Sequence, residues 1–286
     1  MNREQYSDTV TWRLAQLTEP QFEKFSALVF EKTGIYLKSE KMELLNARLG
    51  KRLRACKIDS FKQYYDYVIN DRTGQELVHL IDSVSTNFTS FFREKGHFDF
   101  LTSSVLPSFV LEKRGVDRDI SVWSAACSSG EEPYTLAMVI DDYLSKQARV
   151  NFKIRATDIS TKVLGMAERA VYPEERVSMV SSDFLRRYFQ KGSGGSAGYV
   201  KVKDQLKNYV KFERFNLMDE FKWNEAFDII FCRNVMIYFN RETQAELVRK
   251  FYQCLSPGGY LFIGHSESIS SIKNKFEQVA ATAYRK

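Results

Sequence analysis

Apolar residues follow two different patterns along the chain, and the change falls near residue 85. In the first part, apolar side chains recur at the three- and four-residue spacing of a helix, as they do in residues 20–34. From about residue 118 onward, short apolar runs alternate with helical stretches, which is typical of a mostly parallel sheet covered by helices. We therefore predict a small all-helical domain over residues 1–85 and a doubly wound α/β domain over residues 86–286.

Within the predicted α/β domain, apolar runs are expected to be strands and longer stretches to be helices. The runs are residues 119–125, 152–158, 227–232 and 259–264, and the helical stretches are residues 133–147, 160–170 and 241–255. A turn rich in glycine and serine, followed by alternating residues, interrupts this order at 192–203 and predicts a small antiparallel β insertion at about 190–215. Residues 276–285 are expected to form an edge strand antiparallel to residues 259–264.

The composition is that of an ordinary globular protein, with 286 residues of which 44% are hydrophobic and 27% are charged. The first residues lack the basic and apolar regions of a signal peptide, and no stretch reaches the roughly 18 apolar residues of a membrane span. We therefore expect a cytoplasmic protein. Its 4 cysteines and 3 histidines are scattered without the spacing of a zinc site or a disulfide framework, which predicts reduced thiols and no metal site.

A basic amphipathic helix is predicted over residues 41–57. Its apolar positions form one stripe, while the remaining face carries Arg48, Lys51, Arg52 and Arg54. With a formal net charge of +6 on the chain, this face predicts an acidic partner; a merely solvated surface and a nucleic-acid site are the alternatives. The basic stretch lacks aromatic residues on which single-stranded nucleic acids stack, and this favours an acidic protein surface.

The turn after the first predicted strand has the place of a phosphate-binding turn but the wrong charges. Residues 122–137 read VWSAACSSGEEPYTLA, with small residues before Gly130 and two acids, Glu131 and Glu132, directly after it. A phosphate turn uses several glycines and the positive end of a helix dipole to hold an anion, and acids here would repel a pyrophosphate. A ligand with an ammonium or sulfonium charge would instead be attracted by Glu132.

The second predicted strand ends at Asp158, where a carboxylate can accept hydrogen bonds from both hydroxyls of a ribose. Because ligands of open α/β sheets bind at the carboxyl ends of the strands, the first two strand ends together predict a phosphate-free, positively charged adenosine derivative. S-adenosylmethionine has this profile. Asp158 alone is weak evidence, since an aspartate before a helix is also a common cap.

Polar residues also follow later apolar runs and occur in an aromatic-rich segment upstream. Arg233 and Asn234 come directly after the run 227–232, and such residues at the end of a buried run indicate a site, although Asn234 could also cap a helix. The other candidates of this kind are Asn87, Thr89, Arg93, Asn216, Leu217 and Tyr238.

Several segments, taken together, resemble the chemotaxis receptor glutamate methyltransferases, the CheR family. They are TNFTSFFRE (86–94), VWSAACSSGEEPYTLA (122–137), ATDIS (156–160), FNL (215–217), FCRNVMIYF (231–239) and GGYLFIGHSES (258–268). The resemblance runs in register over most of the chain. It implies an S-adenosylmethionine-dependent methyltransferase fold that converts receptor glutamates to γ-methyl esters, with S-adenosyl-L-homocysteine as the product.

The resemblance also implies roles for individual residues. As catalytic residues, Arg93 would meet the methionine carboxylate or the substrate glutamate, and Tyr238 would meet the incoming glutamate. Glu132 would lie near the cofactor's amino group, and Asp158 would bind the ribose hydroxyls. The remaining cofactor contacts carried over from the family are Asn87, Thr89, Asn216, Leu217, Arg233 and Asn234.

The partners implied by the resemblance are chemotaxis receptors. The basic helix would dock on the acidic methylation region of a receptor through its cations, which are Arg48, Lys51, Arg52 and Arg54. The β insertion would grip a short peptide at the receptor's C-terminus, as it does in some members of the family. We expect no nucleic-acid partner, no membrane insertion and a monomer.

Other functions share parts of this pattern. An NAD-dependent oxidoreductase would use the same strand and helix order, but Gly130 alone makes a poor phosphate turn. A nucleic-acid methyltransferase would match the cofactor and the pI of about 9.0, yet the segment FCRNVMIYF lacks the proline and aromatic run expected around an extruded base. A different protein methyltransferase and a non-catalytic receptor-binding adaptor are the remaining alternatives.

Overall fold

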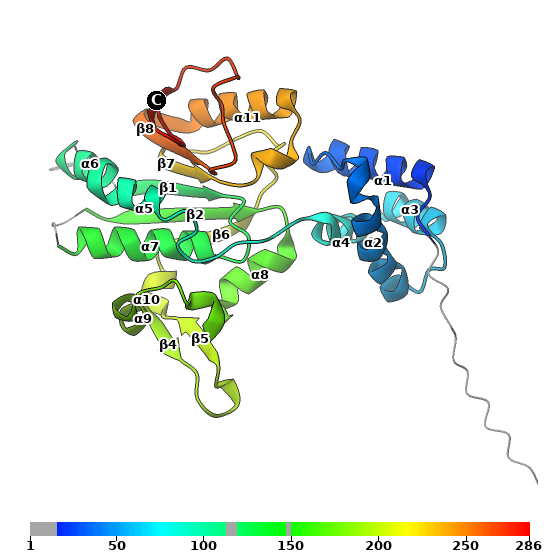
Figure 1. Cartoon of the computed structure of the whole chain (residues 1–286), viewed down its shortest axis with the longest axis horizontal. Helices are drawn as coiled ribbons and strands as arrows, with labels where there is room; N and C mark the ends of the chain where they lie inside the picture. The colour runs from blue at the N-terminus through cyan, green and yellow to red at the C-terminus, as the bar shows by residue number, and fades with distance from the viewer. Residues whose placement is uncertain (1–15, 113–118, 147–149) are drawn as a thin grey trace, which may run out of the picture. The chain divides into compact units, whose positions relative to one another are not determined.

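Two compact units make up the protein in a computed structural model that describes residues 16–112, 119–146 and 150–286 (Figure 1). The first unit comprises Met1–Leu28 and Leu37–Val84, and the second comprises Val29–Tyr36 and Ser85–Lys286. The chain thus changes units between residues 84 and 85, and a short earlier segment also belongs to the second unit. None of the described helices is both long enough and apolar enough to cross a membrane.

The first unit is helical, as the apolar periodicity predicts. It is built from the main part of α1 (Glu19–Thr33) and from α2 (Met42–Cys56), α3 (Phe61–Asn70) and α4 (Gln75–Val84), with a short 3-10 turn at Ser39–Lys41. Its core includes Phe25 and Tyr64, whose rings stack with centroids 6.0 Å apart, and the stripe residues Leu49 and Leu53 of α2. Burial of one apolar stripe per helix is what stabilises such a small bundle.

A seven-stranded sheet forms the centre of the second unit. Its strands are β1 (Ile120–Ala125), β2 (Phe152–Asp158), β6 (Val210–Arg214), β7 (Phe227–Cys232), β8 (Leu255–Ile263), β9 (Glu277–Ala280) and β10 (Ala283–Arg285). Their order is β6-β2-β1-β7-β8-β10-β9, and the pairs from β6 through β8 are parallel. The order reverses between β1 and β7, and open sheets of this kind bind ligands at such a switch point.

The predicted C-terminal edge strand is confirmed in part. β10 pairs antiparallel with β8, as expected. The stretch 276–285 is nevertheless divided, because β9 turns back on β10 and becomes the outermost strand.

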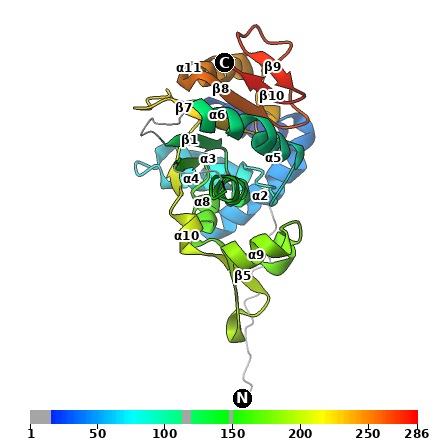
Figure 2. The ribbon, with the colours of Figure 1, turned by 90° about the vertical axis from the view of Figure 1, so that its left-hand side faces the viewer.

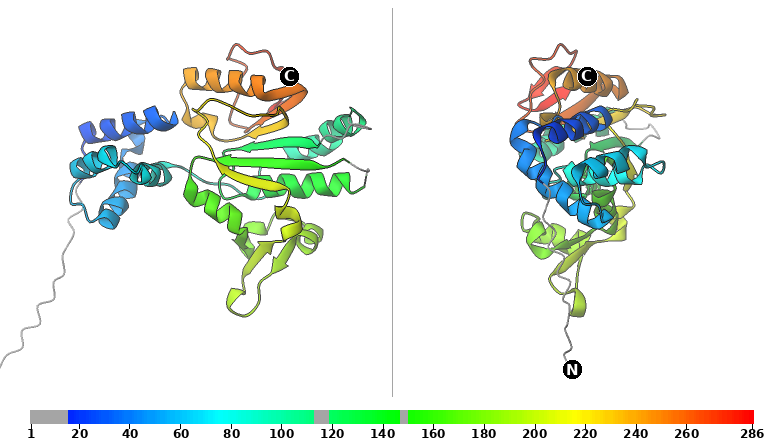
Figure 3. Two further views of the ribbon diagram at one scale, coloured as in Figure 1. Left: turned by 180° about the vertical axis from the view of Figure 1, so that it is seen from behind. Right: turned by 90° about the vertical axis from the view of Figure 1, so that its right-hand side faces the viewer.

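Helices cover both faces of the sheet, which makes it doubly wound as predicted (Figures 1 and 3). One face carries α5 (Gly96–Phe100), a π-helical turn (Leu101–Val105), α6 (Leu106–Glu112), α7 (Glu131–Leu144) and α8 (Thr161–Arg169), and the other carries α11 (Arg241–Cys254). Neighbouring side chains of β1 point to opposite faces of the sheet. Val122 therefore belongs to the hydrophobic core on the first face, and Trp123 belongs to the core on the face covered by α11.

The antiparallel insertion exists, but its bounds differ from the predicted residues 190–215. The small sheet has the order β3-β5-β4, formed by Val171–Pro173, Tyr199–Val202 and Phe189–Lys191. The helix α9 (Ser182–Tyr188) belongs to the same part of the unit, which Figure 2 shows below the main sheet, and α10 (Asp204–Lys207) leads back to that sheet. β6 lies within the predicted range but pairs with β2. A three-residue strand such as β3 is too short to show alternation, so only its pairing reveals it.

Candidate functional site

The turn after β1 is tightly folded and needs a glycine at its end. Gly130 directly precedes α7 and has a φ of 97°, and a Cβ there would lie 2.8 Å from the Tyr172 hydroxyl and 2.9 Å from the Ala167 Cβ. Ala126 and Ser128 also have positive φ values, of 61° and 50°. The glycine therefore serves the close packing of this turn, and no phosphate is needed to explain it.

The two acids that follow Gly130 point to different partners. Glu131 is fully buried, pairs with Arg176 at 2.5 Å and accepts a hydrogen bond from the Ser129 hydroxyl. Glu132 accepts a hydrogen bond from Ser124 Oγ at 2.7 Å, and its Oε2 lies 3.2 Å from Nε of Arg233. Burial raises the pKa of Glu132, and the Arg233 charge opposes that rise.

Asp158 ties two loops together at the end of β2. Its Oδ2 accepts a hydrogen bond from the Ser128 amide at 2.8 Å, and its Oδ1 accepts one from the Ser160 amide at 2.9 Å. The cap of α8 is Ser160, whose side chain accepts a hydrogen bond from the Val163 amide. Asp158 therefore does not cap α8 itself. Because a carboxylate oxygen can accept more than one hydrogen bond, these two bonds leave Asp158 able to accept others.

Arg233, the first residue after β7, is a buried cation between two acids. Its Nε lies 3.2 Å from Glu132 Oε2 and 3.7 Å from Glu94 Oε2, and its Nη2 donates a hydrogen bond to the Arg93 carbonyl at 2.7 Å. Its guanidinium also stacks over the ring of Phe98. Arg233 thus connects the loop after β7 with the turn after β1 and with the segment that precedes α5.

Sequence reasoning assigned no role to Glu94, although it lies in the quoted segment TNFTSFFRE. Its Oε1 accepts hydrogen bonds from the Asn234 side chain and from the His265 amide, both at 3.2 Å. Burial alone would raise the pKa of Glu94, but Arg233, Asn234 and His265 together hold it below its usual range. Glu94 is therefore a charged partner of both predicted cofactor residues at the end of β7.

Glu267 is a second acid that sequence reasoning missed. Its carboxylate accepts hydrogen bonds from the backbone amides of Asn234 (2.9 Å), Met236 (2.7 Å) and Gly264 (2.5 Å). Asn234 has a positive φ of 58°, so this carboxylate fixes an unusual backbone conformation. Burial raises the pKa of Glu267, and these amides oppose the rise. The only sequence signal was its place in the quoted segment GGYLFIGHSES.

The predicted residues at the end of β6 have structural partners. The Asn216 side chain donates a hydrogen bond to the Lys32 carbonyl at 2.7 Å and accepts one from the Met218 amide at 3.1 Å. Leu217 is buried in the core beside α11. The partner Lys32 belongs to the segment Val29–Tyr36, which is part of the second unit.

The segment Val29–Tyr36 reaches two of the loops at this end of the sheet. The Tyr36 amide donates a hydrogen bond to the Tyr238 carbonyl at 2.8 Å. Gly34 has a φ of 71°, and a Cβ there would lie 2.4 Å from Met218 Sδ. The helical spacing of residues 20–34 gave no sign of these contacts.

The remaining predicted residues are half-buried and lie on the same loops. Ser128 donates a hydrogen bond from its hydroxyl to the Asn87 carbonyl at 2.9 Å, which joins the segment before α5 to the turn after β1. Arg93 donates one to the Phe88 carbonyl at 2.9 Å. Thr89 lies between Asn87 and Arg93 in the sequence, and Tyr238 ends the 3-10 turn Met236–Tyr238 after β7. The structure thus brings the predicted residues together on loops at the carboxyl ends of β1, β2, β6 and β7 and on the segment before α5.

Two histidines that lie far apart in sequence also meet near Arg233. The rings of His97 and His265 have centroids 5.0 Å apart, and Glu94 lies beside both. Burial and the Arg233 charge lower the pKa of His97 from 6.5 to about 4. No metal site was expected because the histidines and cysteines are scattered along the sequence. Among the described residues, however, Glu94, His97 and His265 lie close together in space.

In the helical unit, two of the four cations on the predicted basic face have hydrogen-bond partners within the unit. Arg52 forms a bidentate ion pair with buried Glu76, whose Oε1 also accepts the Tyr64 hydroxyl at 2.7 Å. Arg48 donates a hydrogen bond to the Val84 carbonyl at 2.7 Å. Lys51 and Arg54 are exposed. Glu76 is on α4, so the acid that neutralises Arg52 could not be seen in the helix sequence itself.

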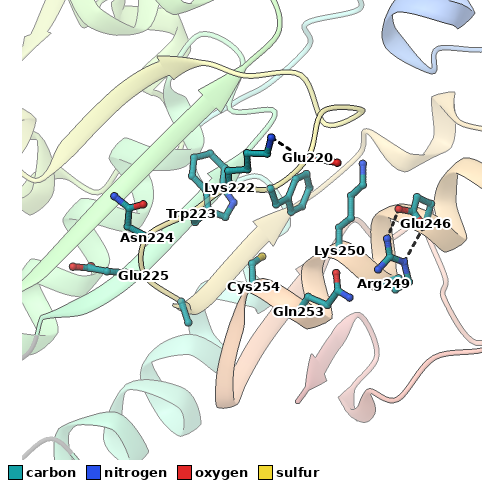
Figure 4. A pocket seen from close by; sticks show the side chains of 12 residues that line it. Glu220, Lys222, Trp223, Asn224, Glu225, Glu246, Arg249, Lys250, Gln253 and Cys254 are labelled. Atoms are coloured by element: carbon teal, nitrogen blue, oxygen red, sulfur yellow. Dashed lines mark hydrogen bonds and ion pairs between the residues drawn. The ribbon is translucent and has the colours of Figure 1, made fainter.

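An open cavity of about 630 Å³ lies elsewhere in the second unit, between residues 220–226 and α11 (Figure 4). Its walls include Trp223 and Lys250 and the ion pairs Glu220–Lys222 and Glu246–Arg249. The cavity borders the amino end of β7, whereas the predicted site follows the carboxyl end of that strand. It is therefore not the predicted cofactor site.

The sheet order defines the class, a doubly wound α/β domain that binds its ligand at the carboxyl ends of parallel strands. Residues 87–285 match the family described as CheR methyltransferase, SAM binding domain, and residues 20–85 match CheR methyltransferase, all-alpha domain. The chain belongs to the CheR methyltransferase family. The resemblance predicted from its motifs is confirmed, and so is S-adenosylmethionine as the cofactor of the domain.

Full-length relatives support the same assignment. The chain is 40% identical to the chemotaxis protein methyltransferase of Borreliella burgdorferi over 275 residues, covering 94% of this chain and 95% of that protein. It is 38% identical to the chemotaxis protein methyltransferase of Escherichia coli over 276 residues, covering 96% and 93%. Among solved structures, PKMT2 from Rickettsia typhi in complex with AdoHcy aligns with 50% of this chain and 20% of its own at 17% identity and a TM-score of 0.32, which carries no argument about function.

Proposed function

We propose that the protein is a protein-glutamate O-methyltransferase that forms γ-methyl esters on chemotaxis receptors. The observation that carries this proposal is the position of two acids at neighbouring strand ends: Glu132 follows β1 and Asp158 ends β2. Both belong to the residues that match the SAM binding domain of the CheR family. Acids at this point suit a cationic nucleoside and not a dinucleotide, whose pyrophosphate they would repel. The relatives are named chemotaxis protein methyltransferases, and on the resemblance of the motifs we propose chemotaxis receptors as the substrate class.

The residues present fit S-adenosylmethionine, which supplies the methyl group as a sulfonium when it is bound. Asp158 is buried at the end of β2, where its carboxylate can accept hydrogen bonds from a ribose. Glu132 and Arg233 form a fixed pair of opposite charges, suited to the ammonium and carboxylate of a methionine moiety. Asn87, Thr89, Asn216, Leu217 and Asn234 remain the predicted contacts for the rest of this ligand.

The reaction needs positioning more than proton transfer. A glutamate has a reference pKa of about 4.3, so its carboxylate is already an ionised nucleophile near neutral pH. The nucleophile therefore carries no proton that a side chain of the protein would have to accept. Arg93 and Tyr238 would orient the carboxylate, and exclusion of water would strengthen these contacts.

Receptor binding is assigned to the cations of α2 whose side chains are exposed. Lys51 and Arg54 are exposed, whereas Arg52 is neutralised by Glu76. We therefore propose that Lys51 and Arg54 meet an acidic receptor surface and that Arg48 and Arg52 mainly hold the helix in place. Binding of a receptor C-terminal peptide by the antiparallel insertion stays a prediction.

The test is a methyl-transfer assay with labelled S-adenosylmethionine and receptor-containing membranes. We expect label in the receptor that is released by mild base, because a carboxyl ester hydrolyses under conditions in which methylated amines do not. Label in nucleic acid, or base-stable label in protein, would contradict the proposal.

The cofactor assignment is tested separately by calorimetry on Asp158→Asn. The substitution removes the charge but keeps one carbonyl oxygen, and hydrogen bonds to charged groups contribute about 1.5–3 kcal/mol, so the Kd for S-adenosylmethionine should rise at least about tenfold. The matched control is Asp183→Asn on α9, an exposed acid that lies 3.3 Å from Arg186 and 3.6 Å from Arg187, and the Kd of this variant should not change. Unchanged affinity in Asp158→Asn would contradict the ribose assignment.

A further inference from the structure

Glu94, His97 and His265 form a cluster whose potential ligand atoms all lie within 4.8 Å of one another. His97 Nδ1 is 3.5 Å from Glu94 Oε2. Two ligands of a tetrahedral zinc ion at bond lengths near 2.0–2.1 Å are separated by about 3.3 Å, so these two atoms already have the spacing of neighbouring metal ligands. The third residue, His265, is exposed, and its ring centroid is 5.0 Å from that of His97.

The two buried ligand atoms lack hydrogen-bond partners. Among the described residues, neither His97 Nδ1 nor Glu94 Oε2 has one, although each has an atom surface that is closed to solvent. Buried polar atoms are nearly always satisfied, and each exception calls for a cause such as an ion. The other atoms of both side chains are bound, because His97 Nε2 is 2.5 Å from Thr282 Oγ1 and Glu94 Oε1 accepts two hydrogen bonds.

The bound atoms orient the cluster as supporting residues do in known metal sites. A histidine that binds a metal through one nitrogen usually donates a hydrogen bond from the other, which fixes its ring and its tautomer. In the tautomer in which His97 Nε2 donates to Thr282, Nδ1 keeps a lone pair that faces the Glu94 carboxylate. In that tautomer two acceptors face each other at 3.5 Å, and a cation between them would remove their repulsion.

The charge around the cluster is also suited to a cation. Arg233 is the buried cation here, and it is shared between the acids Glu94 and Glu132. Glu267 adds a third buried carboxylate to the same loop through its bonds to Asn234 and Gly264. A divalent cation near Glu94 Oε2 would compensate this excess of negative charge, and Glu132 would keep the closer contact with Arg233.

We propose that Glu94, His97 and His265 bind a divalent transition-metal ion, with Zn²⁺ as the best match for one carboxylate and two imidazoles and with water completing a tetrahedral set. Two nitrogen ligands and one oxygen ligand are typical of zinc sites that keep an open position. The ion would enter from the exposed side of His265. The proposal does not rest on the methyl transfer proposed above, although Glu94 also pairs with Arg233 and Asn234 of the predicted cofactor site.

The test measures metal binding directly. Protein freed of metal with a chelator is titrated with Zn²⁺ by calorimetry and with Co²⁺ by visible absorption, because four-coordinate Co²⁺ absorbs far more strongly than the hydrated ion. We expect one ion per chain and a four-coordinate spectrum. His265→Ala should weaken Zn²⁺ binding at least about tenfold, and it should remain folded because the His265 side chain is exposed and its amide still reaches Glu94.

The matched control is His79→Ala, which removes the remaining histidine of the chain from an exposed position on α4. Its Zn²⁺ affinity and Co²⁺ spectrum should equal those of the unmodified protein. Equal binding by His265→Ala, loss of binding in His79→Ala, or only the spectrum of hydrated Co²⁺ in the unmodified protein would each overturn the proposal. Melting curves of both variants in chelator confirm that the comparison is between folded proteins.

Discussion

At the scale of single residues, the charges buried around Arg233 hold the candidate site together. Glu132 and Glu94 approach the guanidinium from two segments, and Glu267 fixes the backbone of the next residue, Asn234. Removing one partner of such a buried set leaves an uncompensated charge, which costs more than the pair contributes. The positions of Arg233 and Asn234 therefore depend on three acids, and of these Glu267 has no ligand in our proposals.

His97 should make stability depend on pH in the mildly acidic range. Its pKa is lowered from 6.5 to about 4 in the folded protein, so between these values the unfolded chain binds a proton that the folded protein does not. Stability is therefore fully present above about pH 6.5 and falls as the pH drops toward 4, by about 3 kcal/mol at most for this buried group. Urea unfolding in the presence of a chelator measures this dependence.

The comparison that isolates His97 uses His97→Gln and His79→Ala. The glutamine cannot titrate, so the free energy of unfolding of that variant should fall less steeply with decreasing pH than that of the unmodified protein. His79 is exposed, and its variant should keep the original slope. An unchanged slope in His97→Gln would show that other groups cause the acid sensitivity.

At the scale of elements, the start of α7 is anchored from two sides. Glu131 reaches Arg176, which lies in the 3-10 turn Glu174–Val177 of the insertion, while Tyr172 on β3 donates a hydrogen bond to the Ser129 carbonyl at 2.7 Å. Gly130 allows Tyr172 and Ala167 to approach the turn. The antiparallel insertion therefore also supports the turn that carries Glu132.

Arg176→Gln should destabilise the second unit by about 2–3 kcal/mol. Glu131 is fully buried and would lose its cation, but the Arg176 side chain is 41% exposed, so we expect less than the 3–5 kcal/mol typical of a fully buried pair. The control Arg186→Gln removes an exposed partner of Asp183 and should cost less than about 0.5 kcal/mol. Chemical denaturation measures both, and equal effects would contradict the structural role of the Arg176–Glu131 pair.

At the scale of the whole molecule, the two units divide the tasks of the proposed reaction. The second unit carries the predicted cofactor contacts, and the helical unit carries the exposed cations of α2. Within the helical unit, the Arg52–Glu76–Tyr64 network joins α2, α3 and α4, so the cationic face rests on a fixed support. Substrate recognition and cofactor binding should therefore respond to different substitutions.

The double variant Lys51→Glu, Arg54→Glu should impair receptor methylation without changing S-adenosylmethionine affinity. Reversal of two exposed charges opposes an acidic partner, and we expect kcat/KM for the receptor to fall at least about tenfold at low salt, with a smaller effect at high salt because exposed charges are screened. Lys62→Glu on α3 is the control, since it reverses an exposed charge in the same unit. A loss of cofactor affinity in the double variant, or an equal loss of methylation in Lys62→Glu, would contradict this division.

Much of the fold could be read from the chain because its signals are local. The short apolar runs at residues 152–158 and 227–232 mark β2 and β7 with the bounds observed, and the periodicity of residues 41–57 marks α2. The motif VWSAACSSGEEPYTLA placed Glu132 after the first strand, and the strand ends placed Asp158 and Arg233 at one edge of the sheet. Such patterns depend only on neighbours along the chain.

Only the tertiary structure decided which distant residues become partners. Glu76 neutralises Arg52 from another helix, and Glu267 binds the amide of Asn234 across 33 residues. His97 and His265 meet although they lie far apart in the chain, because the helix that begins at Gly96 packs on the sheet near the end of β8. Periodicity determined the elements, whereas burial of charge selected these partners, since a buried charge is stable only when the fold brings an opposite charge or a hydrogen-bond donor to it.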